Sequence, residues 1–285
     1  MGERLQKVLA QHGLGSRRQI ESWMREGRVL LNDAPAAPGA QFAPGDRVKI
    51  DGRDVTARLA IEAAPAVLVY NKPVGEAVVQ TGAEPESVLA RLPAGRGERW
   101  VPVNRMSPGD SGLVLFTNDG RLANALMRSA ASLPAVYMVR AHPGGGTPAP
   151  EALSTTVNLD EGPVQFEAVE AAGGEGANQW FRVVAQGADR RHAVRALFES
   201  QDMTVSRVSQ LRFADVELPR DLPRGRHRRL SPEFVARLYE RAGLEAPLVE
   251  DKKPAPRRTG TRRGASQSPA ADRPRRGKPP TRKRR

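Results

Sequence analysis

The sequence predicts an α+β fold with a small N-terminal domain, a larger domain and a basic tail. In the first 27 residues apolar side chains recur at helical spacing, whereas from residue 67 to 243 strand-like runs of four to seven residues are mixed with two or three helical patterns. Such a mixture is typical of helices that flank a mixed, largely antiparallel sheet. At 285 residues with 39% hydrophobic residues, the chain is long enough for both domains and a buried core.

The small domain is predicted to begin with two short helices. Leu5 and Leu9 share one helical face, and Gly13 is a typical residue to end a helix. Ser16 followed by Gln19 matches a capping box, which marks the start of the second helix. The apolar residues after this capping box keep helical spacing as far as the next glycine.

Two strands, at 29–33 and 46–52, are predicted to complete the small domain. Cationic side chains lie on the first turns of its helices, beside a helix N-terminus whose free backbone N–H groups favour anions. A phosphate could dock there, although each such cation taken alone is more often a solvated surface charge. The residues of this domain that we expect to contact RNA are Arg4, Lys7, Ser16, Arg17 and Arg18.

We predict four segments: residues 1–53 form the small domain, 54–65 a linker, 66–245 the larger domain and 246–285 a disordered basic tail. The tail carries 14 Lys or Arg against 3 Asp or Glu, which leaves only +2 of the chain's +13 net charge on residues 1–245. Flexible cations of this kind exchange counterions with a phosphate backbone, so nucleic-acid contact is favoured over solvation or a membrane surface.

Composition excludes several functional classes. The chain has no cysteine, so disulfides, thiolate metal sites and cysteine nucleophiles are excluded, and its four histidines are too scattered for a metal site. There is no apolar run of about 18 residues, and the charged start lacks the apolar centre of a signal peptide. We therefore expect a cytoplasmic monomer that has no metal, no small-molecule cofactor and no membrane contact.

A polar loop that enters an apolar strand carries the motif with the most chemical information. Residues 104–113 read Asn-Arg-Met-Ser-Pro-Gly-Asp-Ser-Gly-Leu. They resemble the central motif of ribosomal RNA pseudouridine synthases of the RsuA and RluB type, which reads Gly-Arg-Leu-Asp, two residues, Thr, one residue, Gly-Leu. Arg105 and the Gly112-Leu113 pair match this motif. Ser107, however, occupies the position of the family's catalytic aspartate.

The resemblance extends along both domains. The small domain is similar to S4-like RNA-binding domains, and an ordered series of shorter matches continues almost to residue 243. These matches lie at 70–75, 113–124, 137, 161–163, 176–181, 194–198, 205–207, 218–219 and 222–225. The resemblance implies an S4-like domain followed by a pseudouridine-synthase-like domain, with structured RNA, above all ribosomal RNA, as the partner.

The serine matters because of the family's chemistry. In the family that the chain resembles, the aspartate attacks the target uridine without a cofactor. A carboxylate suits this step because it is ionised at neutral pH and nucleophilic without help, whereas a serine hydroxyl needs a neighbouring base. Asp110, at the family's threonine position, could substitute if Pro108 and Gly109 reshape the loop, but a displacement of even about 1 Å is costly for covalent catalysis.

Two retained residues each allow two interpretations. The resemblance makes Arg105 an active-site arginine, yet an arginine at a loop start can simply brace the turn. It places Tyr137 in the base pocket, although a tyrosine in a strand is more often part of the core. The basic run at 224–229 could extend the RNA footprint or form an exposed turn. The larger domain's expected RNA contacts are Arg195, Arg224 and Arg226.

Three functions are compatible with these features of the sequence. The one we favour is an RNA-binding protein that is catalytically impaired or inactive and acts on structured ribosomal RNA or in ribosome assembly. The first alternative is an active pseudouridine synthase that uses Asp110 or another group. The second is a general RNA chaperone that acts through the basic tail.

Overall fold

The computed structural model describes residues 2–59, 64–78, 87–93, 99–143, 153–175, 178–187 and 190–246. The chain divides into two units, Met1–Val249 and Glu250–Arg285. All but the first residue of the tail predicted at 246–285 lies outside the described residues.

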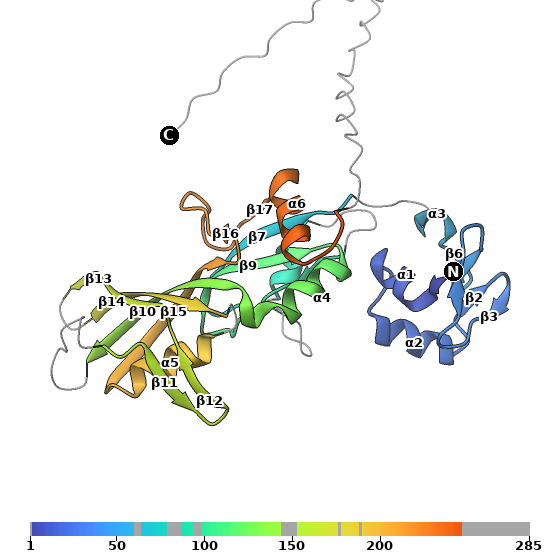
Figure 1. Ribbon diagram of the computed structural model, residues 1–285. Coiled ribbons are helices and arrows are strands. Elements are labelled where there is room, and N and C mark those ends of the chain that lie inside the picture. Colours follow the sequence, from blue (N-terminus) through green and yellow to red (C-terminus); the bar gives the residue numbers. More distant parts are fainter. Residues whose placement is uncertain are drawn as a thin grey trace, which may run out of the picture. The chain divides into compact units, whose positions relative to one another are not determined.

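The small domain contains three helices, the last of them only four residues long, and a short sheet (Figure 1). Its elements are β1 (Glu3–Arg4), α1 (Leu5–Gln11), α2 (Arg17–Arg25), β2 (Val29–Leu31), β3 (Ala34–Pro35), β4 (Gln41–Phe42), β5 (Val48–Ile50), β6 (Arg53–Asp54) and α3 (Thr56–Leu59). Strands β3, β2, β5 and β6 form the sheet in that order, and β1 pairs with β4. Leu5 and Leu9 of α1 and Ile20 of α2 are fully buried in the core of this domain.

The predicted start of the second helix is confirmed. The Ser16 hydroxyl accepts a hydrogen bond from the Gln19 amide at 3.1 Å, and the Gln19 side chain accepts one from the Ser16 amide at 3.4 Å. Gly13 has a φ of 70°, so it ends α1 in the left-handed conformation that glycine tolerates best. These two features end α1 and begin α2.

The small domain continues beyond its predicted boundary at residue 53. Val55 is buried in the core of this domain, and the Thr56 hydroxyl accepts a hydrogen bond from the Val48 amide at 2.9 Å. Residues predicted to form the start of a linker therefore belong to β6 and α3. The alanine-rich composition of this stretch gave no sign that one valine would anchor it.

The larger domain is built on a nine-stranded mixed sheet (Figure 1). Its main strand order is β13-β14-β10-β15-β9-β7-β17, while β16 pairs with β15 and β8 with β9. The strands are β7 (Val67–Lys72), β8 (Val101–Pro102), β9 (Ser111–Thr117), β10 (Pro134–Pro143), β13 (Ala168–Glu175), β14 (Asn178–Gln186), β15 (Met203–Phe213), β16 (Val216–Glu217) and β17 (His227–Arg229). The remaining elements are a hairpin of β11 (Thr156–Leu159) and β12 (Gly162–Gln165), the helices α4 (Gly120–Arg128), α5 (Arg191–Glu199) and α6 (Pro232–Arg241), and the 3-10 turns η1 (Val88–Arg91) and η2 (Ala130–Ser132). The predicted α+β class is confirmed.

Strands β7 and β9 are buried on both faces of the sheet. Val69 and Leu115 point into the cluster that contains helices α4, α5 and α6, whereas Leu68 and Val114 point into a second cluster with Trp100. The alternation follows from the two-residue repeat of side chains along a strand. It explains why these two strands read as continuous apolar runs in the sequence.

A parallel pairing joins β9 to β15. The two strands pair at Ser209 with Ser111 and at Gln210 with Gly112, at the start of β9. Because α5 precedes β15 and packs against it, this pairing brings helix α5 to the loop that leads into β9. The candidate site lies at that junction.

Candidate catalytic site

The loop before β9 places a serine and a carboxylate side by side. The Ser107 hydroxyl donates a hydrogen bond to Oδ2 of Asp110 at 2.7 Å, and the Asp110 amide donates to the Ser107 carbonyl at 3.2 Å. Ser107 is exposed, whereas Asp110 is only 4% exposed. The side chain at position 107 thus faces outward, and the carboxylate lies behind it.

Two arginines of α5 hold the Asp110 carboxylate. Arg195 donates a hydrogen bond to Oδ1 of Asp110. The Nε atom of Arg191 lies 3.8 Å from Oδ2. Both carboxylate oxygens are therefore engaged by charged or hydroxyl donors.

Arg191 is in turn held by buried amides. Its Nη1 donates to Oε1 of Gln210 at 3.1 Å, and Asn104 donates to the same oxygen at 3.0 Å. The Asn104 side chain also accepts a hydrogen bond from the Leu115 amide at 2.9 Å. This network connects the position of the carboxylate to the backbone of β9 and to β15.

The Lys72 side chain hydrogen-bonds to the backbone of the loop that carries Ser107 and Asp110. Its fully buried ammonium group donates hydrogen bonds to the carbonyls of Asp110 at 2.8 Å, of Pro73 at 2.9 Å and of Pro108 at 3.4 Å. Burial lowers the pKa of Lys72 to about 8, although Glu76 and Asp110 favour its charged form. Lys72 therefore positions the loop that carries Ser107 and Asp110.

Arg105 and Tyr137 lie in different surroundings. Arg105 is exposed on the loop. Tyr137 is fully buried in the core of the larger domain, and its hydroxyl accepts a hydrogen bond from the Arg190 amide at 3.2 Å. The Tyr137 ring is thus a core residue whose hydroxyl braces the residue before α5.

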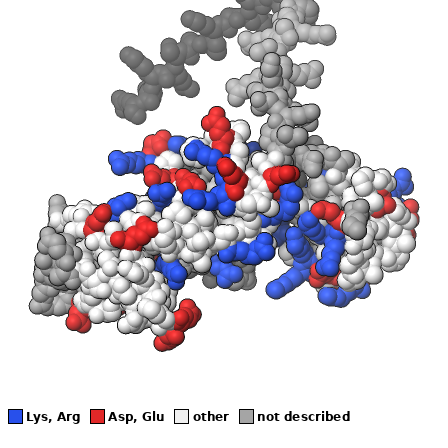
Figure 2. Space-filling view, in the orientation of Figure 1, with Lys and Arg blue, Asp and Glu red and all other residues white. Residues whose placement is uncertain are grey.

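The expected RNA-contacting residues of the small domain lie at or near the surface. Arg4, Arg17 and Arg18 are exposed, while Lys7 and Ser16 are partly buried. Lys7 is also paired with Glu3. Figure 2 shows Lys and Arg side chains spread over the visible face near α1 and α4, whereas the surface around β11 and β12 is mostly uncharged. On this face, cationic side chains are therefore more numerous near α1 and α4 than around β11 and β12.

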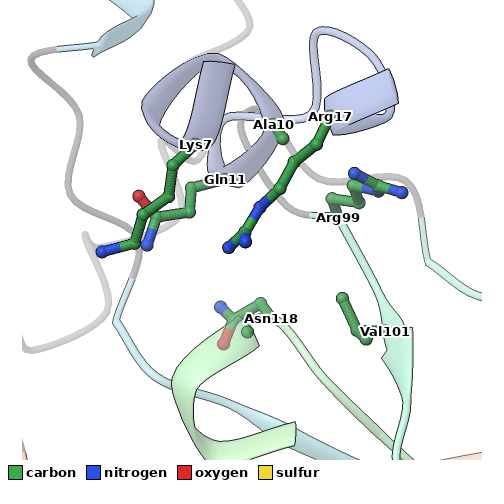
Figure 3. Close-up of a pocket in the computed structure, with 8 residues that line it drawn as sticks. Lys7, Ala10, Gln11, Arg17, Arg99, Val101 and Asn118 are labelled. Carbon is green, nitrogen blue, oxygen red and sulfur yellow. The ribbon is translucent and has the colours of Figure 1, made fainter. Parts of the chain in front are cut away.

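A small cavity of about 50 Å³ brings some of these cations together (Figure 3). Arg99 donates a hydrogen bond to the Gly15 carbonyl at 3.1 Å, and burial together with the nearby Arg17 cation lowers the pKa of its guanidinium. The cavity is lined by Lys7, Ala10, Gln11, Arg17, Arg99, Val101, Asn118 and Gly120. Figure 3 shows the Arg17 guanidinium directed into the cavity and that of Arg99 directed away from it, so Arg17 is the cation that the cavity offers to an anion.

The basic run at the end of the larger domain forms a turn and the edge strand β17. Arg224 and Arg226 are exposed, and the Arg226 carbonyl accepts a hydrogen bond from the Asn71 amide at 3.0 Å. Arg228 pairs with Asp221 at 2.8 Å. The run therefore lies beside the end of β7, close in the fold to the turn that Lys72 supports.

Sequence reasoning missed three residues of these sites. Lys72 had a recognisable signal, since it ends a buried strand before a proline. Arg191 and Arg99 had none, because their contacts depend on pairings between segments far apart in the chain. Arg195, which was expected to bind RNA, pairs with Asp110, while 31% of its side chain stays exposed.

Among the described residues, no group of three or more His, Cys, Asp or Glu is arranged to hold a metal ion. No helix in the described part of the chain combines the length and the apolar composition needed to cross a membrane.

Each of the two domains matches a known protein family. Residues 66–212 match the family described as RNA pseudouridylate synthase, and residues 3–56 match the S4 domain. A crystal structure described as a pseudouridylate synthase superposes with a TM-score of 0.51 at 19% identity, covering 82% of this chain and 99% of that one. At this identity the superposition supports the fold alone.

Several relatives carry the name ribosomal large subunit pseudouridine synthase B. The protein from Salmonella typhi is 38% identical over 271 residues, which cover 94% of this chain and 92% of the relative. Those from Pseudomonas aeruginosa and Xanthomonas campestris pv. campestris are 40% and 41% identical over 86% and 85% of this chain. The chain spans only 64% and 50% of the lengths of these last two. With an S4 domain followed by the matching fold and sequence, the chain belongs to the RNA pseudouridylate synthase family.

Proposed function

We propose that this chain binds structured ribosomal RNA on a pseudouridine synthase scaffold whose isomerase chemistry is lost or strongly impaired. The observation that carries the proposal is the geometry of the loop before β9. The exposed side chain at position 107 is a hydroxyl, and the nearest carboxylate, Asp110, is 4% exposed with both oxygens engaged. A nucleophile must reach the substrate, and this carboxylate is turned toward α5.

Ribosomal RNA is the proposed partner because of the relatives' names and the cationic surfaces. The relatives are named as synthases of the large ribosomal subunit. Arg17 and Arg99 both line the cavity, and each offers a cation for a phosphate contact, which fixes register on RNA without reading its sequence. Such contacts make binding strongly dependent on salt.

The RNA-binding part of the proposal predicts the effect of removing these cations. We expect Arg17→Gln and Arg99→Gln each to weaken binding to large-subunit RNA and to reduce the slope of log affinity against log salt by about 1. Fluorescence titration at several salt concentrations measures both quantities. Arg25→Gln, at an exposed position in the last turn of α2, is the matched control and should change neither. Equal slopes for all four proteins would contradict the phosphate contact.

One observation favours isomerisation by Asp110 as a second candidate function. Its Oδ2 lies 2.7 Å from the hydroxyl that stands at the family's nucleophile position, so a carboxylate is present next to that position. This candidate predicts pseudouridine in RNA incubated with the wild-type protein and its loss in Asp110→Asn. The proposed function predicts no pseudouridine in either sample.

The same binding assay measures how much the basic tail contributes to RNA affinity. If the tail alone carried the affinity, removal of residues 246–285 would abolish binding to structured RNA. We expect affinity to fall with the loss of the tail's cations, while the dependence on Arg17 and Arg99 persists. Loss of that dependence would favour a general RNA chaperone.

A further inference from the structure

An exposed apolar side chain stands on the turn next to the candidate site. Val74 is 49% exposed, the largest value among the large hydrophobic residues described as exposed. It is the second residue after β7, between Pro73 and Gly75. Single exposed apolar residues are common on protein surfaces. What distinguishes Val74 is the way its turn is held.

The turn is fastened on one side to the loop that carries Ser107 and Asp110. The Gly75 amide donates a hydrogen bond to the Pro108 carbonyl at 2.8 Å. Lys72 connects the same two segments, since it donates to the carbonyls of Pro73 and Pro108. Val74 is therefore fixed at the rim of the candidate site.

The buried carboxylate of Glu76 holds the end of the turn that follows Gly75. Glu76 is only 3% exposed, and it accepts a hydrogen bond from the Tyr70 hydroxyl at 2.5 Å. Arg91 pairs with the same carboxylate at 3.2 Å while about half of its own side chain stays exposed. Burying a carboxylate and an ammonium group within a few residues is costly unless both are bonded, as they are here. The valine between them is held on a rigid support.

The surroundings of Val74 suit RNA. The Arg91 side chain remains 48% exposed beside Glu76, and that of Arg195 remains 31% exposed beside Asp110. The turn of Val74 is thus connected through Glu76 to one accessible guanidinium group and through the Asp110 loop to another, and an apolar group near such cations complements a nucleobase next to its phosphates. Apolar side chains inserted against base steps are a known way of unstacking nucleic acids.

We infer that Val74 contacts a nucleobase of the bound RNA and holds it unstacked at the rim of the Ser107–Asp110 loop. The inference rests on the RNA binding proposed above but not on whether the chain isomerises uridine. Because the turn is already fixed, the contact costs little ordering of the protein, so the apolar area that it buries contributes directly to affinity. Val74 is in this sense a positioning residue for the RNA.

Val74→Thr tests the contact with the smallest possible change. Threonine keeps the shape and the backbone preferences of valine but replaces a methyl group by a hydroxyl. We expect this variant to bind large-subunit RNA about fourfold more weakly, and to reduce the fluorescence rise of 2-aminopurine placed in the RNA target. Thermal unfolding should be unchanged, because the altered group is exposed. Met127→Gln, at a 38% exposed position on α4, is the matched control and should bind like wild type.

Each outcome decides the inference. Wild-type affinity and an undiminished fluorescence rise in Val74→Thr would overturn it, as would an equal loss in Met127→Gln. If the wild-type protein fails to bind structured RNA, this inference and the RNA-binding proposal both fail. If instead the wild type forms pseudouridine, only the proposed loss of catalysis fails, and the affinity of Val74→Thr still decides the role of the valine.

Discussion

Gly112→Ala is expected to prevent folding of the larger domain, or to lower its free energy of unfolding by more than about 4 kcal/mol. A Cβ atom at this position would lie 2.2 Å from the carbonyl oxygen and 2.8 Å from the amide nitrogen of Gln210. Both atoms belong to the backbone of β15, so neither can rotate away. Gly112 also has a φ of 106°, which L-residues rarely adopt. Urea unfolding followed by circular dichroism measures the effect.

Gly109→Ala is the matched control for this substitution. Gly109 lies in the same loop, and a Cβ there meets nothing within 4 Å. We expect a change of no more than about 0.5 kcal/mol, as for most surface substitutions. If Gly112→Ala unfolds at the same urea concentration as Gly109→Ala, the parallel pairing of β9 with β15 is not required at the site.

Asp110→Ala is expected to lower the free energy of unfolding by about 3 kcal/mol. The substitution leaves the guanidinium groups of Arg191 and Arg195 without their carboxylate, and an uncompensated charge in a largely buried site is costly. The partial exposure of Arg195 to solvent places the expected cost at the lower end of the range for buried pairs. Thermal and urea unfolding both measure the loss.

Ser107→Ala measures how much the serine hydroxyl alone contributes to stability, for comparison with the loss caused by Asp110→Ala. This substitution removes one hydrogen bond to Asp110 and should cost about 1 kcal/mol. Equal losses for the two variants would show that the arginines do not depend on Asp110. That result would remove the main support for a carboxylate fixed toward α5.

The sequence predicted local features better than long-range contacts. The capping box of α2 and the glycine that ends α1 depend on residues only a few positions apart, and both appear as predicted. The proximity of Ser107 and Asp110 was also accessible, because three residues in a Pro-Gly turn cannot separate far. The resemblance of the motif to the synthase family gave the fold class correctly.

The remaining parts of the site depend on pairing between distant segments. Arg191 and Arg195 reach Asp110 because β15 pairs in parallel with β9, a register that no local pattern specifies. The extension of the small domain beyond residue 53 depends on burial of Val55 and on the hydrogen bond between Thr56 and the Val48 amide. In both cases the decisive interaction is a tertiary contact, which local propensity and residue spacing do not predict.

The most direct test of the account is the pseudouridine content of large-subunit RNA after incubation with two proteins. One is the wild type, and the other is a Ser107→Asp, Asp110→Thr double variant, which restores the residues that the family's motif has at these two positions. We expect the wild-type protein to bind the RNA without forming pseudouridine, whereas the double variant forms it. Pseudouridine formed by the wild-type protein would contradict the proposed loss of catalysis and would assign the chemistry to the loop as it stands.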